Sequence, residues 1–261
     1  MKGERLDANI AAVFARNLPR MSRAQVIARA AAKEQCVLDF LASGEVWSTS
    51  VILAALLGLH QRRANDLGQR LERDGLVTIH RVDARTTVVG ITAQGLAYSH
   101  HPNAAETQRF EPGRISPQFI AHHVDTQRAR LQAEAAGWTW EAGKTLFRRG
   151  WNKVPDAVAI APSGERVAVE IERTIKTELR YAQVIPATLR DIKIGRYDRV
   201  LYLSPQNRAD AIERALRRVE KVKVGGESVA LTLAHWSRFK FANLDDWPAT
   251  GEDGRWAEAE S

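Results

Sequence analysis

Three acids and a lysine lie close together in the middle of the chain: Asp156, Glu170, Glu172 and Lys176. Asp156 opens one apolar run, and the two glutamates interrupt a second apolar run. Because side chains two apart on a strand share a face, Glu170 and Glu172 should lie together, within reach of Asp156 on the neighbouring strand. Converging carboxylates repel unless a cation intervenes, and hard oxygen ligands suit Mg²⁺ or Mn²⁺. We therefore expect a divalent-metal site here.

The elements that would position these acids follow from the apolar spacing. Residues 153–160 and 166–174 predict two neighbouring strands joined by a turn at 162–165. A helix is expected over 119–136, a second from about Arg173 with Lys176 and Arg180 on one face, and a third over 207–219. Residues 199–203 read as a buried strand. The alternation of strands and helices predicts an α/β domain.

Each of these residues also has a simpler structural explanation. Glu170 and Glu172 could be the solvent face of an edge strand. Lys176 and Arg180 could form helix-surface ion pairs with Glu172 and Glu178, since residues four apart are neighbours on a helix. The histidine pair 122–123 is typical of a helix surface, and the tryptophans at 138, 140 and 151 are typical of a core. The proximity of Asp156 to the two glutamates favours the functional interpretation.

A second set of elements lies earlier in the chain, over residues 33–98. Helices are expected from Lys33 to Leu41, from a cap at Ser48 or Thr49 to Leu57, and from about Gln61 to Arg73. Two strands follow, 76–81 and 86–91, joined by a tight turn at 83–85, with a short helix after Thr92.

This order resembles the winged helix-turn-helix DNA-binding domains, in which the third helix enters the major groove. The resemblance implies DNA contacts from the polar face of the helix over 61–73 and from the hairpin tip, because Arg pairs with guanine or phosphate and Asn or Gln with adenine. The implied DNA-binding residues are Arg62, Arg63, Asn65, Gln69, Arg70, Arg81 and Arg85. A winged helix that only packs or binds protein is the alternative.

Composition sets the broad class. The chain has 261 residues and a net charge of +7, and six acids oppose one arginine in the segment from Asp245 to Ser261. The remainder is therefore strongly basic, as suits a nucleic-acid partner. Cys36 is the single cysteine, which excludes a multi-cysteine zinc site. We expect no membrane span and no secretory signal, hence a cytoplasmic protein.

Pro155-Asp156 followed by Glu170-x-Glu172 on a strand resembles the PD-(D/E)xK nuclease superfamily, although Glu172 stands where that family has a lysine. The longer strings EIERTIKTELRY and YDRVLYLSP are similar to the MOBC class of plasmid-mobilisation relaxases and the related replication-relaxation proteins, over roughly residues 33–220. The implied fold class is α/β (α+β): an N-terminal winged helix-turn-helix followed by a PD-(D/E)xK-like domain with a mixed sheet flanked by helices. The implied segments are an arm (1–30), a winged helix (31–100), a linker (101–118), a nuclease-like domain (119–240) and an acidic tail (241–261).

The resemblance implies metal-assisted phosphodiester hydrolysis in DNA. Asp156, Glu170 and Glu172 would bind Mg²⁺ or Mn²⁺, and Lys176 would replace the missing lysine at the scissile phosphate. Arg180 and Tyr181 would contact DNA, with Tyr181 as a less favoured covalent nucleophile. A further acid is expected from residue 134 or 141, and DNA orientation from the histidine at 122 or 123.

The resemblance further implies nicking at a plasmid or mobile-element origin during conjugative mobilisation. Expected partners are double-stranded origin or operator DNA, other mobilisation proteins or a coupling protein, and a second copy of the chain, without a membrane. Two alternatives stay open. One is a non-catalytic accessory or replication regulator with a degenerate nuclease fold, which the absent lysine supports. The other is a plain transcriptional repressor, which leaves the acidic cluster unexplained.

Overall fold

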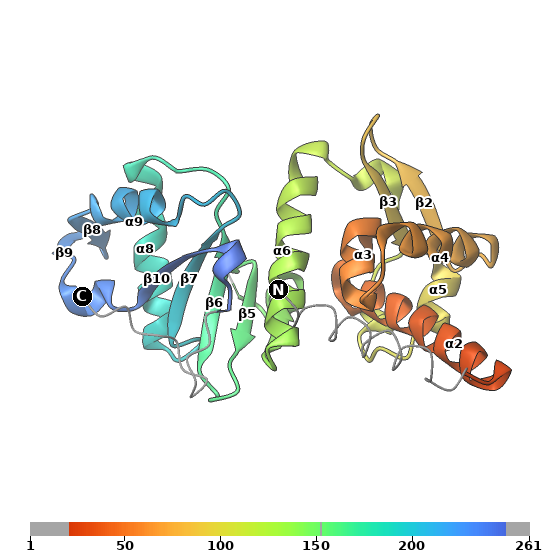
Figure 1. Cartoon of the computed structure of the whole chain (residues 1–261). Helices are drawn as coiled ribbons and strands as arrows, with labels where there is room; N and C mark the ends of the chain where they lie inside the picture. The colour runs from red at the N-terminus through yellow and green to blue at the C-terminus, as the bar shows by residue number, and fades with distance from the viewer. Residues whose placement is uncertain (1–20, 152, 249–261) are drawn as a thin grey trace, which may run out of the picture.

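The computed structural model describes residues 21–151 and 153–248, and it is a mixed α/β structure (Figure 1). The first half is built on a three-stranded sheet in the order β1-β3-β2 with helices packed against it. Its elements are α2 (Arg23–Phe40), η1 (Leu41–Glu45), β1 (Trp47–Thr49), α3 (Ser50–Leu57), α4 (Gln61–Arg73), β2 (Val77–Arg81), β3 (Thr87–Ile91) and α5 (Ala93–Tyr98).

Helix α2 begins ten residues before the expected start at Lys33, inside the segment assigned to an N-terminal arm. Ser22 explains the early start, because its hydroxyl accepts from the Gln25 N–H and the Gln25 side chain accepts from the Ser22 N–H. Such a reciprocal cap satisfies two amide groups that a helix N-terminus otherwise leaves unpaired. Helices α3 and α4 agree with expectation, and the Thr49 hydroxyl caps α3 as predicted.

The segment assigned to a linker packs on the first half instead of spanning open space. It contains two single 3₁₀ turns, η2 (Ala104–Glu106) and η3 (Pro112–Arg114). Phe110 is buried, and its N–H donates to the Ile91 carbonyl at 2.8 Å. A Cβ on Gly90 would lie 2.0 Å from the Phe110 ring, so only glycine allows the ring to cover the strand there.

The second half is built on a mixed five-stranded sheet in the order β10-β7-β6-β5-β4. Strands β4, β5 and β6 pair antiparallel, whereas β6, β7 and β10 pair parallel. The elements are α6 (Pro117–Ala135), β4 (Thr139–Ala142), α7 (Gly143–Arg148), β5 (Ala157–Ile160), β6 (Arg166–Ile171), α8 (Glu178–Lys193), β7 (Arg199–Ser204), α9 (Ala209–Arg217), β8 (Lys221–Val224), β9 (Glu227–Ala230), α10 (Leu233–Trp236), β10 (Phe239–Asn243) and η4 (Leu244–Asp246).

Helices cover both faces of this sheet. On one face α6 packs through Ala129 and Ala133 against the odd-numbered apolar residues of β6, such as Val169. On the other face α8 and α9 pack through residues such as Ile185 and Leu216. Small residues on α6 let its backbone approach the sheet closely, and burial of both faces explains the nearly continuous apolar runs of the strands.

Two boundaries differ from expectation in the second half. The helix expected from Arg173 begins at Glu178, because the Thr177 side chain caps it and Glu172 still extends the sheet by donating its N–H to the Leu203 carbonyl. Strand β10 crosses the expected end of the domain at residue 240. Beyond it Trp247 is buried and its indole N–H donates to the Ala129 carbonyl. Trp256, the other tryptophan expected to dock the tail, lies outside the described residues.

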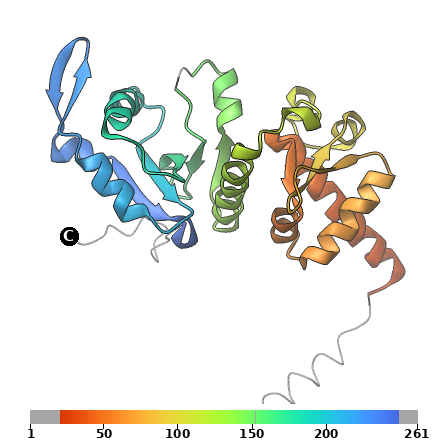
Figure 2. The ribbon, with the colours of Figure 1, turned by 90° about the horizontal axis from the view of Figure 1, so that it is seen from above.

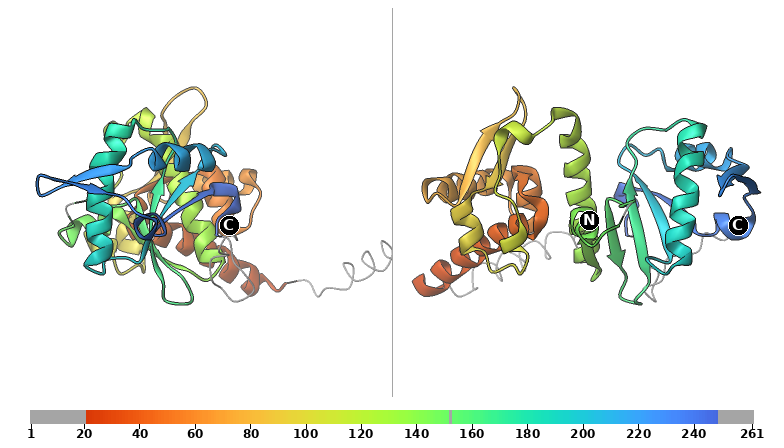
Figure 3. Two further views of the ribbon diagram at one scale, coloured as in Figure 1. Left: turned by 90° about the vertical axis from the view of Figure 1, so that its left-hand side faces the viewer. Right: turned by 180° about the vertical axis from the view of Figure 1, so that it is seen from behind.

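Helix α6 lies between the rest of the second half and the first half (Figures 1 and 2, and Figure 3, right). Its Val124 and Leu131 pack on the core of the first half, and its alanines pack on the sheet. The tip of the β2–β3 hairpin and the segment between β6 and α8 lie at the same end of the molecule (Figure 1). In the part of the chain that the structure describes, no helix has the length and apolar character to cross a membrane.

Candidate functional site

Asp156 and Glu170 stand opposite each other at one end of the sheet. The register of β5 on β6 begins with Ala157 across from Val169, and its continuation by one residue would place Asp156, just before β5, across from Glu170. Besides burial, the charge of Asp156 acts on Glu170 and raises its pKa, as expected for two neighbouring acids. The Ile171 N–H donates to Asp156 Oδ2 at 2.7 Å and holds this carboxylate at the end of β6. The structure thus brings together the two acids predicted to lie on neighbouring strands.

The surroundings of Glu170 disfavour the loss of the proton from its carboxyl group. Burial and, next, the charge of Asp156 raise the pKa of Glu170 to about 7. The Glu170 side chain is 22% exposed, so solvent reaches it, but most of the side chain is shielded from water. A strongly shifted acid beside a second acid is typical of functional sites. Nearby cations offset the repulsion only in part: the charges of Lys153 and Lys176 lower the pKa of Glu170, but less than burial and Asp156 raise it.

Lys153 lies beside Glu170 and was not singled out from the sequence. Its Nζ is 3.9 Å from Glu170 Oε1 and donates to Thr188 Oγ1 on α8. Burial lowers the pKa of Lys153, and the charge of Glu170 opposes that shift. In the sequence Lys153 is three residues before Asp156. No spacing rule for helices or strands would have connected the two residues. Lys153 is therefore a cation held at the carboxylate pair by the loop before β5.

Glu172 and Lys176 pair with each other rather than with Asp156 or Glu170. Lys176 Nζ donates to Glu172 Oε2, and the Lys176 N–H donates to Tyr181 Oη at 3.1 Å. Burial raises the pKa of Glu172, and its hydrogen bond with Lys176 acts in the opposite direction. Among the residues described, no three His, Cys, Asp or Glu side chains form a group that could hold a metal. Three carboxylates were expected to bind a metal together. Asp156 and Glu170 lie close to each other, whereas Glu172 is paired with Lys176.

His122, on helix α6, contacts Asp156. Its Nε2 is 3.0 Å from Asp156 Oδ1, and this hydrogen bond raises the pKa of His122. With Ile171 on Oδ2, both oxygens of Asp156 are held. His122 was expected to orient DNA, but here it orients Asp156. Near it, Arg173 forms an ion pair with Asp125 of the same helix, fixing the start of the segment after β6.

Other predicted participants lie elsewhere. Tyr181 is 1% exposed and its hydroxyl is engaged by Lys176, so it offers no surface to DNA and no free nucleophile. Arg180 is exposed in the first turn of α8. Glu134 pairs with Arg130, and Glu141 pairs with Arg149, so neither adds a third acid to the pair.

The residues predicted to contact DNA on α4 divide between its two flanks. Asn65 and Gln69 line a groove with Arg85 of the hairpin. Arg63 and Arg70 line a second groove, between α4 and α2. At 3.6 residues per turn, Arg62 lies on the outward side between these flanks, and it is exposed. The buried face of α4 is Ala64, Leu67, Gly68 and Leu71.

The hairpin arginines have different roles. Arg81 donates to the carbonyls of Asp83 and Ala84 at 3.1 Å each, so it closes the turn. Arg85 is exposed, and its backbone N–H donates to Asp83 Oδ1 at 2.7 Å. Hydrogen bonds from the Arg85 and Thr86 amides lower the pKa of Asp83. Of the two arginines, Arg85 has its guanidinium available to a ligand.

A buried polar network joins the two halves through α6. Gln127 is fully buried; its Nε2 donates to the Trp47 carbonyl at 2.8 Å and its Oε1 accepts from Ser48 Oγ at 2.9 Å. Arg130 lies 2.9 Å from Glu45, a carboxylate that is almost fully buried. His123 also packs here, 3.1 Å from the Trp47 carbonyl. The site and the first half are thus positioned by one helix.

Comparison with protein-family models, with curated proteins and with solved structures finds no match to this chain.

Proposed function

We propose that this protein binds double-stranded DNA through its first half and cleaves a phosphodiester bond with its second half. The element order from α2 to β3, three helices followed by a two-stranded hairpin, supports a winged helix in the first half. The acids at the ends of β5 and β6 support a PD-(D/E)xK-like domain in the second. The single observation that carries the proposal is the opposed pair of Asp156 and Glu170, with Lys153 beside it.

Asp156 and Glu170 would hold Mg²⁺ or Mn²⁺, because both are hard oxygen donors and, besides burial, the charge of Asp156 raises the pKa of Glu170 despite the nearby lysines. When bound, the ion would lower the pKa of a water molecule and neutralise charge on the phosphate. His122 and the Ile171 N–H fix the direction of the Asp156 carboxylate. Lys153 Nζ would donate to a phosphate oxygen as negative charge develops there. Lys176 lies farther out, 41% exposed, where it would contact the flanking phosphate.

The two halves are suited to one DNA molecule. Val124 of α6 lines the groove beside the hairpin, and His122, two residues earlier, reaches Asp156. The tip of the β2–β3 hairpin and the segment that follows β6 lie at the same end of the molecule (Figure 1). A duplex held by α4 and Arg85 would therefore continue toward the acids. With the resemblance to mobilisation relaxases, this arrangement favours nicking at an origin of a plasmid or mobile element.

Nicking of a pool of supercoiled plasmids with random inserts tests the proposal. With Mn²⁺ present, wild type should relax a subset of plasmids, and sequencing the nicked ends should yield a common site. Asp156→Asn should lower the rate by at least a factor of about 100, and exposed Glu227→Gln on β9 should have no effect. Equal nicking by wild type and Asp156→Asn would contradict the assignment.

A second candidate is a non-catalytic DNA-binding regulator. The observation that favours it is the pairing of Glu172 with Lys176, which withdraws both groups from the carboxylate pair. Tight binding of wild type to a selected duplex, with neither nicking nor metal uptake, would favour this alternative.

A further inference from the structure

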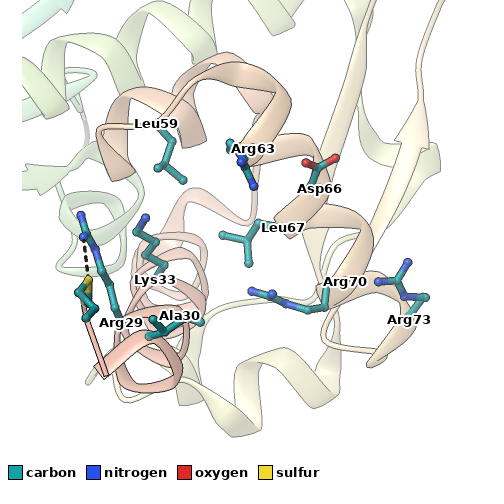
Figure 4. Close-up of a pocket in the computed structure, with 11 residues that line it drawn as sticks. Arg29, Ala30, Lys33, Leu59, Arg63, Asp66, Leu67, Arg70 and Arg73 are labelled. Atoms are coloured by element: carbon teal, nitrogen blue, oxygen red, sulfur yellow. Dashed lines mark hydrogen bonds between the residues drawn. The ribbon is translucent and has the colours of Figure 1, made fainter. Parts of the chain in front are cut away.

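The groove between α2 and α4 is lined by an unusual number of cations (Figure 4). Its volume is about 690 Å³, and we call it the α2–α4 groove. Arg29 and Lys33 enter from α2, and three arginines of α4 enter from the opposite wall, with Leu67 between them. The basic residues that line it are Arg29, Lys33, Arg63, Arg70 and Arg73, against one acid, Asp66.

Few acidic side chains of the described residues neutralise these cations. Glu34 pairs with Arg70 at 2.7 Å. In residues 21–151 and 153–248, no ion pair involves Arg29, Lys33, Arg63 or Arg73. The Nε of Arg70 is buried and has no hydrogen-bond acceptor among the described residues. Because clustered like charges repel, this groove is set up to receive an anionic ligand.

The position of the groove indicates which anion it receives. Arg63 and Arg70 lie seven residues apart and therefore on nearly the same side of α4, away from the side of Asn65 that borders the hairpin. Helix α4 thus has the hairpin on one flank and the basic wall of α2 on the other. A helix lying in a major groove has a phosphate backbone on each flank.

The dimensions fit a sugar–phosphate backbone. At 1.5 Å per residue, Arg63 and Arg70 lie about 10 Å apart along α4, so the basic wall is long enough to follow a strand past more than one phosphate. Among the residues that the structure describes, no aromatic side chain lines the groove, so this part of it offers none of the stacking platforms by which proteins hold unpaired bases. These features favour duplex backbone over single strands.

With α4 in the major groove of the DNA, the β2–β3 hairpin would lie near the backbone of one strand. We propose that the α2–α4 groove binds the phosphodiester backbone of the other strand. The inference rests on the proposed DNA-binding function and extends it to α2, which the sequence resemblance had left out. Arg29, Lys33 and Arg73 become DNA-contacting residues. Because phosphate contacts carry no sequence information, they set affinity and the register of α4 rather than base preference.

The test uses a labelled 30-base-pair duplex of random sequence and measures its Kd over a range of salt concentrations. Each lost phosphate contact reduces the slope of log K against log salt by about 0.9. The double variant Arg29→Gln/Lys33→Gln should therefore reduce the slope by about 1.8 and weaken binding roughly tenfold near physiological salt. The matched control Arg214→Gln/Arg218→Gln removes two exposed charges from the α9 region, far from the groove, and should change neither quantity.

The outcomes separate this inference from the proposal on which it rests. If wild type binds the duplex and Arg85→Gln weakens binding but the α2 variant does not, the inference is overturned and the DNA-binding function stands. If wild type binds no duplex at all, both are overturned. If poly-glutamate of equal charge displaces the duplex from wild type as well as unlabelled duplex does, the groove binds acidic peptide and the inference is wrong.

Discussion

Glu170 has the most perturbed carboxyl group at the site. The folded protein keeps its proton up to a pKa of about 7, whereas the unfolded chain releases it near 4.5. As the pH rises between these values, proton release increasingly favours the unfolded state. Glu170 therefore destabilises the metal-free fold above pH 7 and has little effect at pH 4.

Substitution of Glu170 tests this shift. Glu170→Gln keeps the shape and removes the charge, so in EDTA at pH 8 it should raise the free energy of unfolding by about 3 kcal/mol. At pH 4 the variant and wild type should agree within about 1 kcal/mol. Urea unfolding at both pH values measures the difference, with Glu227→Gln as the surface control. A gain that is equal at both pH values would show that packing, not charge, causes it.

In the proposed reaction, either Lys153 or Lys176 would donate to the scissile phosphate. Lys153 Nζ lies 3.9 Å from Glu170, whereas Lys176 is engaged by Glu172. We expect Lys153→Met to reduce the single-turnover nicking rate by a factor of about 100 or more, and Lys176→Met by less than about tenfold. Duplex affinity, measured in the same preparations without metal, should change by less than tenfold. A larger loss of rate from Lys176→Met than from Lys153→Met would restore the assignment made from the sequence.

For single residues, the sequence predicts the positions of those side chains that the periodicity of a strand fixes. The alternation around Glu170 was sufficient to place it near Asp156, because the side-chain period of a strand is fixed. Lys153 was not predictable, because a loop residue has no period. Tyr181 was misread since an aromatic beside cations looks like a DNA contact, but its ring is part of the core under the sheet.

Helix α6 is the element on which the arrangement depends. Glu45 from the first half is almost fully buried, and Arg130 of α6 is its guanidinium partner at 2.9 Å. Burial alone would raise the pKa of Glu45, but the charges of His123 and Arg130, together with hydrogen bonds to the carboxylate, outweigh burial and lower it. Removing one member of such a buried pair leaves an uncompensated charge.

Substitutions on α6 test this coupling. Arg130→Met should lower the free energy of unfolding by about 3 kcal/mol. The control Arg128→Met, on the same helix, breaks an exposed pair with Asp245 and should lower it by less than about 1 kcal/mol. Adding Glu45→Leu to Arg130→Met should recover most of the loss. Thermal or urea unfolding gives all three values, and an equal effect of Arg130→Met and Arg128→Met would contradict the coupling.

Element boundaries followed the sequence where local chemistry sets them. The Thr49 cap and the ends of α4 were predictable because caps and apolar spacing act over one or two turns. The start of α2 was missed because its first turns are exposed and lack an apolar stripe. Residues 101–118 were read as a linker because the contact of Phe110 with Gly90 is tertiary and leaves no local pattern.

At the scale of the molecule, α6 brings the two halves into one body. The apolar residues of α6 contribute to two cores, and Gln127 and Arg130 fill the polar contact between them. The α2–α4 groove, the groove beside the β2–β3 hairpin and the pair of Asp156 and Glu170 therefore keep a fixed arrangement relative to one another. In the proposed function the two grooves would bind DNA, and the acid pair would bind a cation. The sequence could predict two folded parts, but not that one helix is common to both.

The proposed function requires that Asp156 and Glu170 together hold one divalent cation. Calorimetric titration with Mn²⁺ at pH 7.5 measures it most directly, with wild type, Asp156→Asn, Glu170→Gln and the surface control Glu227→Gln. We predict one Mn²⁺ per chain for wild type and for Glu227→Gln, and no measurable uptake by Asp156→Asn or Glu170→Gln. Uptake that is unchanged in those two variants, or no uptake by wild type in the presence of duplex DNA, would contradict the claim.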